Sequence, residues 1–333
     1  MNLAIRMALD TKQTHVLHEW KHGRPMIACR FDPSGRYLFS SSEDYTLQRW
    51  TLASGDKVAW AAHDSWVRDF AFSSDGRHVI SAGCDDRIIF WNMDDSEPKP
   101  VREVEAHKGW VRTIAVHPKT GLIATGGNDN VVRLWSADGK LVRELSGHDS
   151  NIYSVFFHPT EDLLLSGDLS CVVRQWNLQD GTQQRELKAT ELHTYNGGQQ
   201  VHYGGVRDIS LSPDGKTLAC TGLHKATNPL GAVNEPLVVL FDWVKGEKKL
   251  QPAAGIKGIG WRTKFLSDGT ELCVSGGSGG GYLLFFKPGE EKPYHQLKLK
   301  DTARDMGMHP DGLMVATTHA DGHIRICRLE AKK

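Results

Sequence analysis

The chain carries no excess of charge of either sign. Lysine plus arginine and aspartate plus glutamate number 40 each, so the formal net charge is +0 at pH 7. A general nucleic-acid binder needs a net basic surface, and we therefore expect no nucleic-acid partner. No apolar run approaches the roughly 18–20 residues that cross a membrane. The N-terminal segment, MNLAIRMALDTKQTHV, lacks the apolar core of a signal peptide. These absences predict a cytoplasmic protein without a membrane partner.

Paired cysteines are also missing. The six cysteines stand far apart, none belongs to a Cys-x-x-Cys pair, and most have β-branched or aromatic neighbours. This spacing argues against a structural zinc site and against a disulfide framework. We expect reduced, buried thiols that act as small apolar side chains, and no cofactor.

What the chain does contain is a repeat. Four stretches close on a tryptophan, and each carries a histidine nine residues before an apolar residue, as in His63 and Phe72. The closing tryptophans recur every 41–44 residues, at Trp50, Trp91, Trp135 and Trp176. A constant offset within a constant period indicates one structural unit that is used repeatedly.

Each unit alternates β-rich segments with turns. In residues 67–91, VRDFAF and HVISAG flank a turn with the sequence SSDG, and RIIFW follows the tight turn CDD. A further strand follows, and four short strands in about 40–45 residues are typical of one blade of a β-propeller. Three weaker units end on Phe241, Phe286 and Cys327, which brings the total to seven.

The last unit lacks a fourth strand of its own. An unassigned β-rich segment, Thr14–Trp20, precedes the first unit. We expect this segment to complete the last blade, because ring closure pairs edges that would otherwise be exposed. The predicted fold is all-β, a seven-bladed propeller of four-stranded antiparallel blades that occupies residues 1–333 as one domain. The predicted blades span about residues 21–60, 61–104, 105–145, 146–188, 189–250, 251–298, and 299–330 with 14–20.

These units resemble the WD40 repeat family over nearly the whole chain, although no unit carries a literal Trp-Asp pair. In that family a His, a Ser or Thr, an Asp and the closing Trp of one blade form a structural hydrogen-bond chain. The resemblance implies complete sets in blades 1 to 3 and a weaker set in blade 4, where Ser170 replaces the aspartate. The implied residues are His22, Ser40, Asp44 and Trp50; His63, Ser81, Asp85 and Trp91; His107, Thr125, Asp129 and Trp135; and His148, Ser166 and Trp176.

The set His63, Ser81 and Asp85 also has the composition of a nucleophilic triad. A catalytic triad would occur once in the chain, whereas this set occurs complete three times. A buried histidine needs partners for both ring nitrogens, and a buried tryptophan N–H needs an acceptor. We therefore interpret these residues as internal bracing and predict no catalytic residue.

Interaction sites of propellers most often lie on the face formed by the loops that join fourth to first strands and second to third strands. We call it the top face. Residues three and five positions after each histidine should flank the mouth of the central channel there. Alignment of the turns in units six and seven extends the series of residues at five positions to Trp261 and Arg304. Arginine and aromatic residues at these positions predict a groove for an acidic or phosphorylated segment of a protein partner. These mouth residues are Trp66, Arg68, Trp110, Arg112, Tyr153, Arg207, Trp261 and Arg304.

A second interpretation stays open for the same residues. Arg68, Arg207 and Arg304 each precede an aspartate, and such pairs could be inter-blade ion pairs that line the channel and bind nothing. A small molecule or anion bound at the arginines is another alternative. An enzyme active site is the least favoured, because no further cluster of titratable residues lacks a structural explanation.

Unit five has two insertions, residues 190–201 and 223–236, which lengthen loops of the top face. We expect them to form one lobe. The lobe holds His193, His202 and His224, but no carboxylate or thiol has ligand spacing near them, so no metal site is predicted. The predicted function is a non-enzymatic protein-interaction scaffold that is a monomer by itself.

Overall fold

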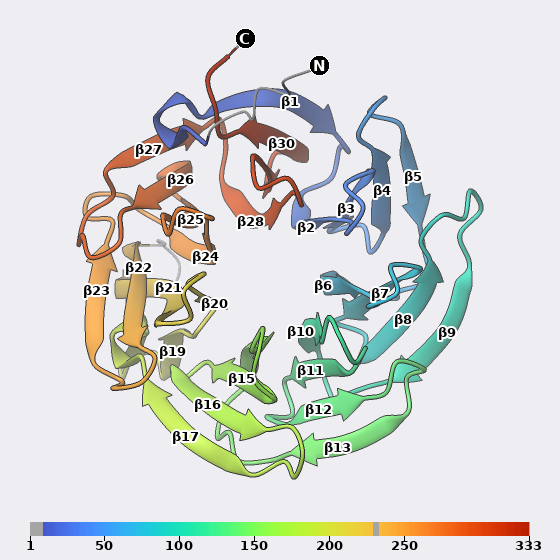
Figure 1. The fold of residues 1–333 in the computed structure, drawn as a ribbon, viewed down its shortest axis with the longest axis horizontal. Coiled ribbons are helices and arrows are strands. Elements are labelled where there is room, and N and C mark those ends of the chain that lie inside the picture. Colours follow the sequence, from blue (N-terminus) through green and yellow to red (C-terminus); the bar gives the residue numbers. More distant parts are fainter. Residues whose placement is uncertain (1–8, 229–232, 333) are drawn as a thin grey trace, which may run out of the picture.

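The structure is a computed structural model that describes residues 9–228 and 233–332. Seven four-stranded antiparallel sheets are arranged as blades around a central axis (Figure 1). The first strand of each blade lies nearest the axis, and the fourth lies at the rim. The predicted all-β, seven-bladed propeller is therefore confirmed.

Blades 1 to 4 follow one another along the chain, and their strands run outward in sequence order. Blade 1 contains β2 (Met26–Phe31), β3 (Tyr37–Ser42), β4 (Leu47–Thr51) and β5 (Lys57–Trp60). Blade 2 contains β6 (Val67–Phe72), β7 (His78–Gly83), β8 (Arg87–Asn92) and β9 (Pro100–Glu105). Blade 3 contains β10 (Val111–Val116), β11 (Ile123–Gly127), β12 (Val132–Trp135) and β13 (Leu141–Leu145). Blade 4 contains β14 (Ile152–Phe157), β15 (Leu163–Asp168), β16 (Val172–Asn177) and β17 (Gln183–Lys188).

Blades 5 to 7 complete the circle. Blade 5 contains β20 (Asp208–Leu211), β21 (Thr217–Asn228), β22 (Val233–Asp242) and β23 (Lys248–Pro252). Blade 6 contains β24 (Ile259–Phe265), β25 (Glu271–Gly277), β26 (Gly280–Phe286) and β27 (His295–Leu299). Blade 7 contains β28 (Ala303–Met308), β29 (Met314–His319), β30 (His323–Arg328) and β1 (His15–Lys21).

The N-terminal strand closes the ring, as expected. β1 runs antiparallel to β30, with His15 opposite Arg328 and Lys21 opposite His323. The first and the last strand, β1 and β30, therefore lie side by side in blade 7 (Figure 1). This pairing gives β30 a neighbour on each side, so blade 7 has four strands, like every other blade.

The apolar core lies mainly between neighbouring blades. Phe39 and Trp60 of blade 1, for example, form one buried cluster with Phe70 and Trp91 of blade 2. The ring centroids of Trp60 and Trp91 are 5.6 Å apart. The six cysteines are buried and free. Apolar side chains are buried between each blade and its neighbour, and this packing makes the disc a rigid support for its loops. In the part of the chain described, no helix is long and apolar enough to cross a membrane.

A polar chain braces blade 2. Trp91 Nε1 donates to Ser81 Oγ (2.9 Å), Ser81 Oγ lies 2.7 Å from His63 Nε2, and His63 Nδ1 lies 2.9 Å from Asp85. The directions are consistent if the serine hydroxyl donates to Nε2 and Nδ1–H donates to the carboxylate. Blade 3 repeats these contacts at 2.9, 2.8 and 2.8 Å, from Trp135 through Thr125 and His107 to Asp129.

Blade 4 corrects the expectation of a weaker network. Ser170 does not take the place of the carboxylate, because Asp168, two residues earlier, lies 2.7 Å from His148 Nδ1. His148 Nε2 lies 2.7 Å from Ser166 Oγ, and Trp176 Nε1 donates to the same oxygen (2.8 Å). Asp168 is buried at the end of β15, so blade 4 has all four members of the brace.

Blade 1 departs from the expected set. Trp50 Nε1 donates to Ser40 Oγ (2.8 Å), but Ser40 donates to the Gln48 side chain (2.8 Å) and not to His22. Gln48 in turn donates to Ser42 (2.7 Å), which replaces Ser40 as the neighbour of the histidine. The contacts of His22 Nε2 are with Asp44 Oδ2 (2.8 Å) and Ser42 Oγ (3.2 Å).

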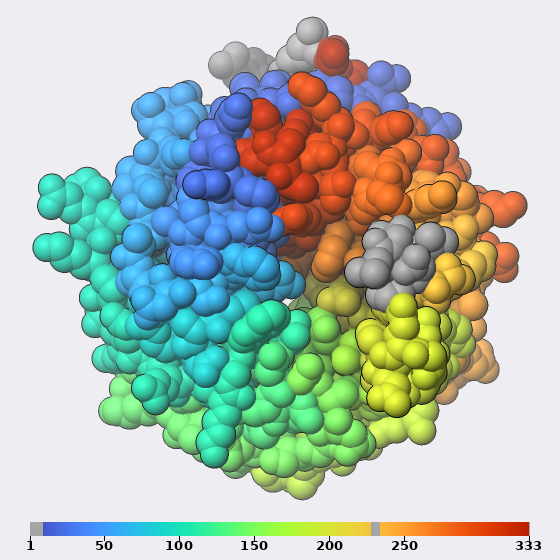
Figure 2. All heavy atoms as spheres, turned by 180° about the vertical axis from the view of Figure 1, so that it is seen from behind, coloured from blue at the N-terminus to red at the C-terminus, as the bar shows by residue number. Residues whose placement is uncertain are grey.

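The first insertion of blade 5 forms a small hairpin on the top face. Its strands, β18 (His193–Asn196) and β19 (Val201–Gly204), contact β21 and stand out in Figure 2 as a yellow lobe. The second insertion, 223–236, was expected to be a loop; its described part instead extends β21 and β22, and residues 229–232 lie outside the described residues.

Candidate functional site

The central channel contains a cavity. It has a volume of about 830 Å³ and is lined by the first strands of the blades. Figure 2 shows a hollow at the centre of the face that carries the β18–β19 hairpin. This hairpin lies in the connection from β17 to β20, so the face is the top face. All the mouth residues except Trp110 line the cavity.

A β-bulge explains how the mouth residues reach the channel. In blade 2, Val67 pairs with Gly83 and Asp69 pairs with Ala82, which leaves Arg68 as the extra residue of the strand. An extra residue of this kind turns its side chain away from the regular alternation. The same shift occurs in four other first strands, at Arg112, Tyr153, Trp261 and Arg304.

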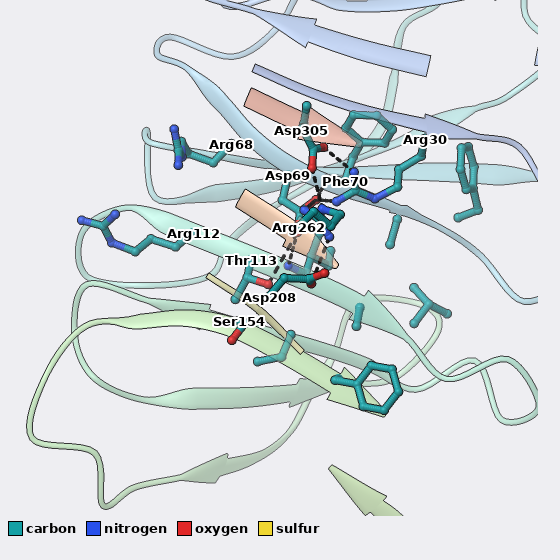
Figure 3. Close-up of a pocket in the computed structure, with 18 of the residues that line it drawn as sticks. Arg30, Arg68, Asp69, Phe70, Arg112, Thr113, Ser154, Asp208, Arg262 and Asp305 are labelled. Carbon is teal, nitrogen blue, oxygen red and sulfur yellow. Dashed lines mark hydrogen bonds and ion pairs between the residues drawn. The ribbon is translucent and has the colours of Figure 1, made fainter. Parts of the chain in front are cut away.

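Below the mouth lies a compact ion-pair cluster that we call the inner cluster. Arg30 contacts Asp69 (2.6 Å) and Asp305 (2.5 Å). Arg262 contacts Asp305 (2.5 Å) and Asp208 (3.4 Å). Figure 3 shows this cluster, with Arg68 and Arg112 directed away from it. Two arginines therefore hold three aspartates of blades 2, 5 and 7.

The aspartates of the inner cluster also join one blade to the next. Asp305 of blade 7 accepts the backbone N–H of Cys29 in blade 1 (2.9 Å). Asp208 of blade 5 accepts the backbone N–H of Thr263 in blade 6 (3.0 Å). Asp69 of blade 2 accepts the backbone N–H of Ile114 in blade 3 (3.3 Å). Although burial opposes ionisation, Arg262 and Arg30 keep the pKa of Asp305 below its usual range. The cluster is charged and structural.

The ion-pair interpretation therefore holds for the three aspartates and for Arg304, but not for Arg68 and Arg207. A bulge separates Arg68 and Arg304 from the aspartates that follow them. The aspartates contact Arg30 and Arg262 instead. Arg304 pairs with Glu43 of blade 1 (2.5 Å). Across residues 9–228 and 233–332, no carboxylate lies within 4.0 Å of the guanidinium nitrogens of the other mouth arginines, Arg68, Arg112 and Arg207.

Aromatic rings hold two of these arginines. Arg112 lies over the rings of Trp110 (5.1 Å) and Tyr153 (4.5 Å). Arg207 lies over Tyr153 (4.2 Å) and Trp261 (5.5 Å). Rings and guanidinium groups thus alternate along blades 3 to 6 of the mouth, and each contact is a cation–π interaction. We call this series the aromatic–arginine row.

Positive charge is in excess in the channel. Seven cationic side chains and four carboxylates line it, an excess of three. Burial lowers the pKa of Arg207, and the neighbouring Arg68 and Arg112 lower it further. Burial lowers the pKa of Arg112 as well, and Arg68 adds to the effect. Arg68, Arg112 and Arg207 repel one another and lack the counter-charge that the inner cluster has.

The outer aromatics of the mouth are open to solvent. The side chains of Trp66 and Trp110 keep 38% and 39% of their surface exposed, in the loops that enter blades 2 and 3. Large exposed aromatic side chains beside cationic groups are typical of interaction surfaces.

Several residues of the site were not predicted. Arg30 and Arg262 carry no repeat signal, because their blades have no Arg-Asp pair at the bulge. Glu43 lies in the tight turn between β3 and β4 of blade 1 and reaches across to blade 7. Of these residues, only Glu43 could have been assigned to the top face from the sequence. It stands one residue before Asp44, a predicted member of the blade 1 brace, and so belongs to a turn of that face.

Two of the three histidines of the lobe contact each other. His193 Nε2 lies 2.9 Å from His202 Nδ1, and the ring of Tyr195 packs on His202 (4.7 Å). His202 lies in the β18–β19 hairpin, opposite Tyr195. His224 lies 3.4 Å from Glu235. Within the described residues, no group of three or more His, Cys, Asp or Glu side chains is placed to hold a metal ion.

Comparison with known proteins supports the repeat assignment. A family model described as "WD domain, G-beta repeat" matches residues 12–51, 57–92, 98–136 and 139–177. These four segments correspond to the four units that close on tryptophan.

Three relatives illustrate the similarity. Protein hir1 of Schizosaccharomyces pombe is 30% identical over 133 residues, which covers 34% of this chain and 14% of the relative. Nuclear distribution protein nudF of Emericella nidulans is 28% identical over 144 residues, 36% of this chain and 32% of the relative. Transcription initiation factor TFIID subunit 5 of Caenorhabditis elegans is 30% identical over 114 residues, 34% of this chain and 17% of the relative.

The matches concern a part of each relative, at most about a third of its length. They therefore bear on the repeats and not on the activity of a whole relative. Four matched repeats and a closed ring of seven four-stranded blades show that this chain belongs to the WD-repeat family.

Proposed function

We propose that this protein is a non-enzymatic scaffold whose channel mouth binds an acidic or phosphorylated segment of a partner protein. The observation that carries the proposal is the lack of a carboxylate partner for Arg68, Arg112 and Arg207 among the described residues, in a channel with excess positive charge. A buried or half-buried guanidinium group without a counter-charge is costly. An anion supplied by a partner would remove that cost.

The fold supports a scaffold rather than a catalyst. Each carboxylate that lines the channel is engaged, Glu43 by Arg304 and the three aspartates by the inner cluster. A general acid or base needs a carboxyl group that is free to exchange protons with a substrate. The relatives are named as a nuclear distribution protein and as a subunit of a transcription initiation factor, and the name of the subunit places it in an assembly.

The proposal includes a monomeric protein in the cytoplasm. A ring that pairs its own terminal strands needs no second copy to cover β30.

The experiment is affinity capture from the native lysate with three forms of the protein. They are the wild type, the charge-reversed variant Arg68→Glu/Arg112→Glu, and a control, Glu43→Gln/Arg304→Gln, which removes an ion pair of the same mouth without changing its net charge. We expect the wild type and the control to capture the same partner and the charge-reversed variant to lose it. Capture that is unchanged by charge reversal contradicts the proposal.

A further inference from the structure

We infer that the mouth is built for a phosphoryl group on a side chain of the partner protein rather than for a carboxylate. This inference rests on the proposed function and narrows it. It follows from the number of free donors, from the excess charge, and from the way in which the aromatic–arginine row orients the guanidinium groups.

The free donors exceed what a carboxylate can accept. Arg68 and Arg207 each keep all their N–H groups, and the Nε atoms of both are buried without an acceptor among residues 9–228 and 233–332. Arg112 donates through Nε to the side chain of Asn128 and keeps its terminal nitrogens. A buried donor without a partner is costly, so an acceptor that a partner protein supplies would stabilise these groups. A carboxylate has two oxygens, whereas a phosphoryl group presents three to surrounding arginines.

The excess charge also matches a phosphoryl group better. The channel carries three more cationic side chains than carboxylates. A carboxylate neutralises one of these charges, whereas a phosphorylated side chain carries about −1.5 to −2 at pH 7. Charge pairs interact more strongly in a half-buried site than in water, so the doubly charged group gains more from this mouth.

The aromatic–arginine row orients the donors in advance. Tyr153 packs against both Arg112 and Arg207, and Trp261 packs against Arg207 as well. The ring centroids lie 4.2–5.5 Å from the guanidinium carbons, and the rings supply no carboxylate, so the N–H groups remain available to an anion. A guanidinium group that is already held loses less freedom on binding. Tyr153 is thus a positioning residue, and its ring matters rather than its hydroxyl.

The test uses three immobilised peptide libraries that differ only at one fixed central residue: phosphothreonine, glutamate or threonine. We expect the wild type to bind the phosphothreonine library at least about tenfold more tightly than the glutamate library, as two or more charge-assisted hydrogen bonds would produce. Arg68→Gln/Arg207→Gln should lose this preference. The control Arg36→Gln/Asp94→Asn, which removes an exposed ion pair outside the cavity lining without changing the net charge, should keep it. Tyr153→Phe should bind as the wild type does, because it keeps the aromatic ring. Tyr153→Leu, which lacks the ring, should bind about tenfold less tightly.

Each outcome has one meaning. Equal binding of the phosphothreonine and glutamate libraries overturns the phosphoryl inference and leaves the proposed function in place. Failure of the wild type to bind either library overturns both. Displacement by an equimolar amount of inorganic phosphate would show that free phosphate is the ligand, which overturns the assignment to a protein side chain. Circular dichroism of every variant, with Tyr153→Phe as the conservative case, separates lost binding from lost folding.

Discussion

The buried Glu271 should make the free energy of unfolding depend on pH in an unusual way. This first residue of β25 is 2% exposed. Its Oε1 accepts a hydrogen bond from the Thr263 hydroxyl (2.8 Å), and its Oε2 has no hydrogen-bond partner among the described residues. Burial raises the pKa of Glu271 from 4.5 to about 7, against the opposing effect of the Thr263 hydrogen bond. The carboxyl group is therefore neutral in the folded protein under mildly acidic conditions.

The magnitude follows from the difference between the folded and unfolded states. A raised pKa in the folded state stabilises the fold below pH 4.5, and this stabilisation is lost as the pH rises to about 7. At 1.36 kcal/mol for each unit of pKa difference, the loss amounts to about 3 kcal/mol. Glu271→Gln keeps the shape but cannot ionise. Relative to the wild type, the variant should therefore gain about 3 kcal/mol in free energy of unfolding between pH 4 and pH 8.

Urea denaturation of both proteins across this pH range measures the difference. The wild type and the variant must be compared at each pH, because His319 affects the stability in the opposite direction. Burial, together with Arg325, lowers the pKa of His319 to about 4. The stabilisation from His319 therefore grows as the pH rises toward 6.5. Glu291→Gln makes the same chemical change at an exposed position and should show no such trend. A difference between wild type and Glu271→Gln that stays constant with pH would refute the reasoning.

Three further predictions concern the ring itself. Asp168→Ala should lower the free energy of unfolding by about 2–4 kcal/mol in urea, because a buried acceptor of His148 is lost, whereas Ser170→Ala should change it by less than about 0.5 kcal/mol. Asp305→Asn should cost about 3–5 kcal/mol in the same assay, since Arg30 and Arg262 lose a buried partner. Deletion of residues 1–21 removes β1 and exposes β30, so gel filtration should show association that increases with protein concentration.

The architecture could be predicted because it depends on spacing alone. A histidine, a turn and a closing tryptophan at constant offsets determine where each strand begins and ends, as in His63 to Trp91. The strand Thr14–Trp20 could be placed in blade 7 because a closed ring leaves one vacancy and the chain has one unassigned strand.

Partners across the channel could not be predicted in the same way. Arg68 and Asp69 are neighbours in sequence, but the bulge turns them apart, and Asp69 meets Arg30 from another blade. Such contacts depend on where seven strands meet at the axis. Local spacing contains no information about which of several arginines faces a given aspartate.

Local substitutions within the braces were also missed. In blade 4 the carboxylate moves two residues, from the position of Ser170 to Asp168, and still reaches His148. In blade 1 a glutamine, Gln48, enters the chain and leaves Ser40 without contact to His22. A hydrogen-bond network tolerates any residue whose polar atom arrives at the right point, so a pattern of residue types describes it incompletely.

The most direct test of the mouth as an anion site compares its four arginines one at a time. Binding of the phosphothreonine library is measured for Arg68→Gln, Arg112→Gln, Arg207→Gln and Arg304→Gln/Glu43→Gln. The structure predicts that each of the first three weakens binding about tenfold, the loss of one charge-assisted contact, and that the last leaves it unchanged because that arginine is already paired. Equal effects at all four positions, or no effect at any of them, would contradict the assignment of the unpaired arginines as the binding site.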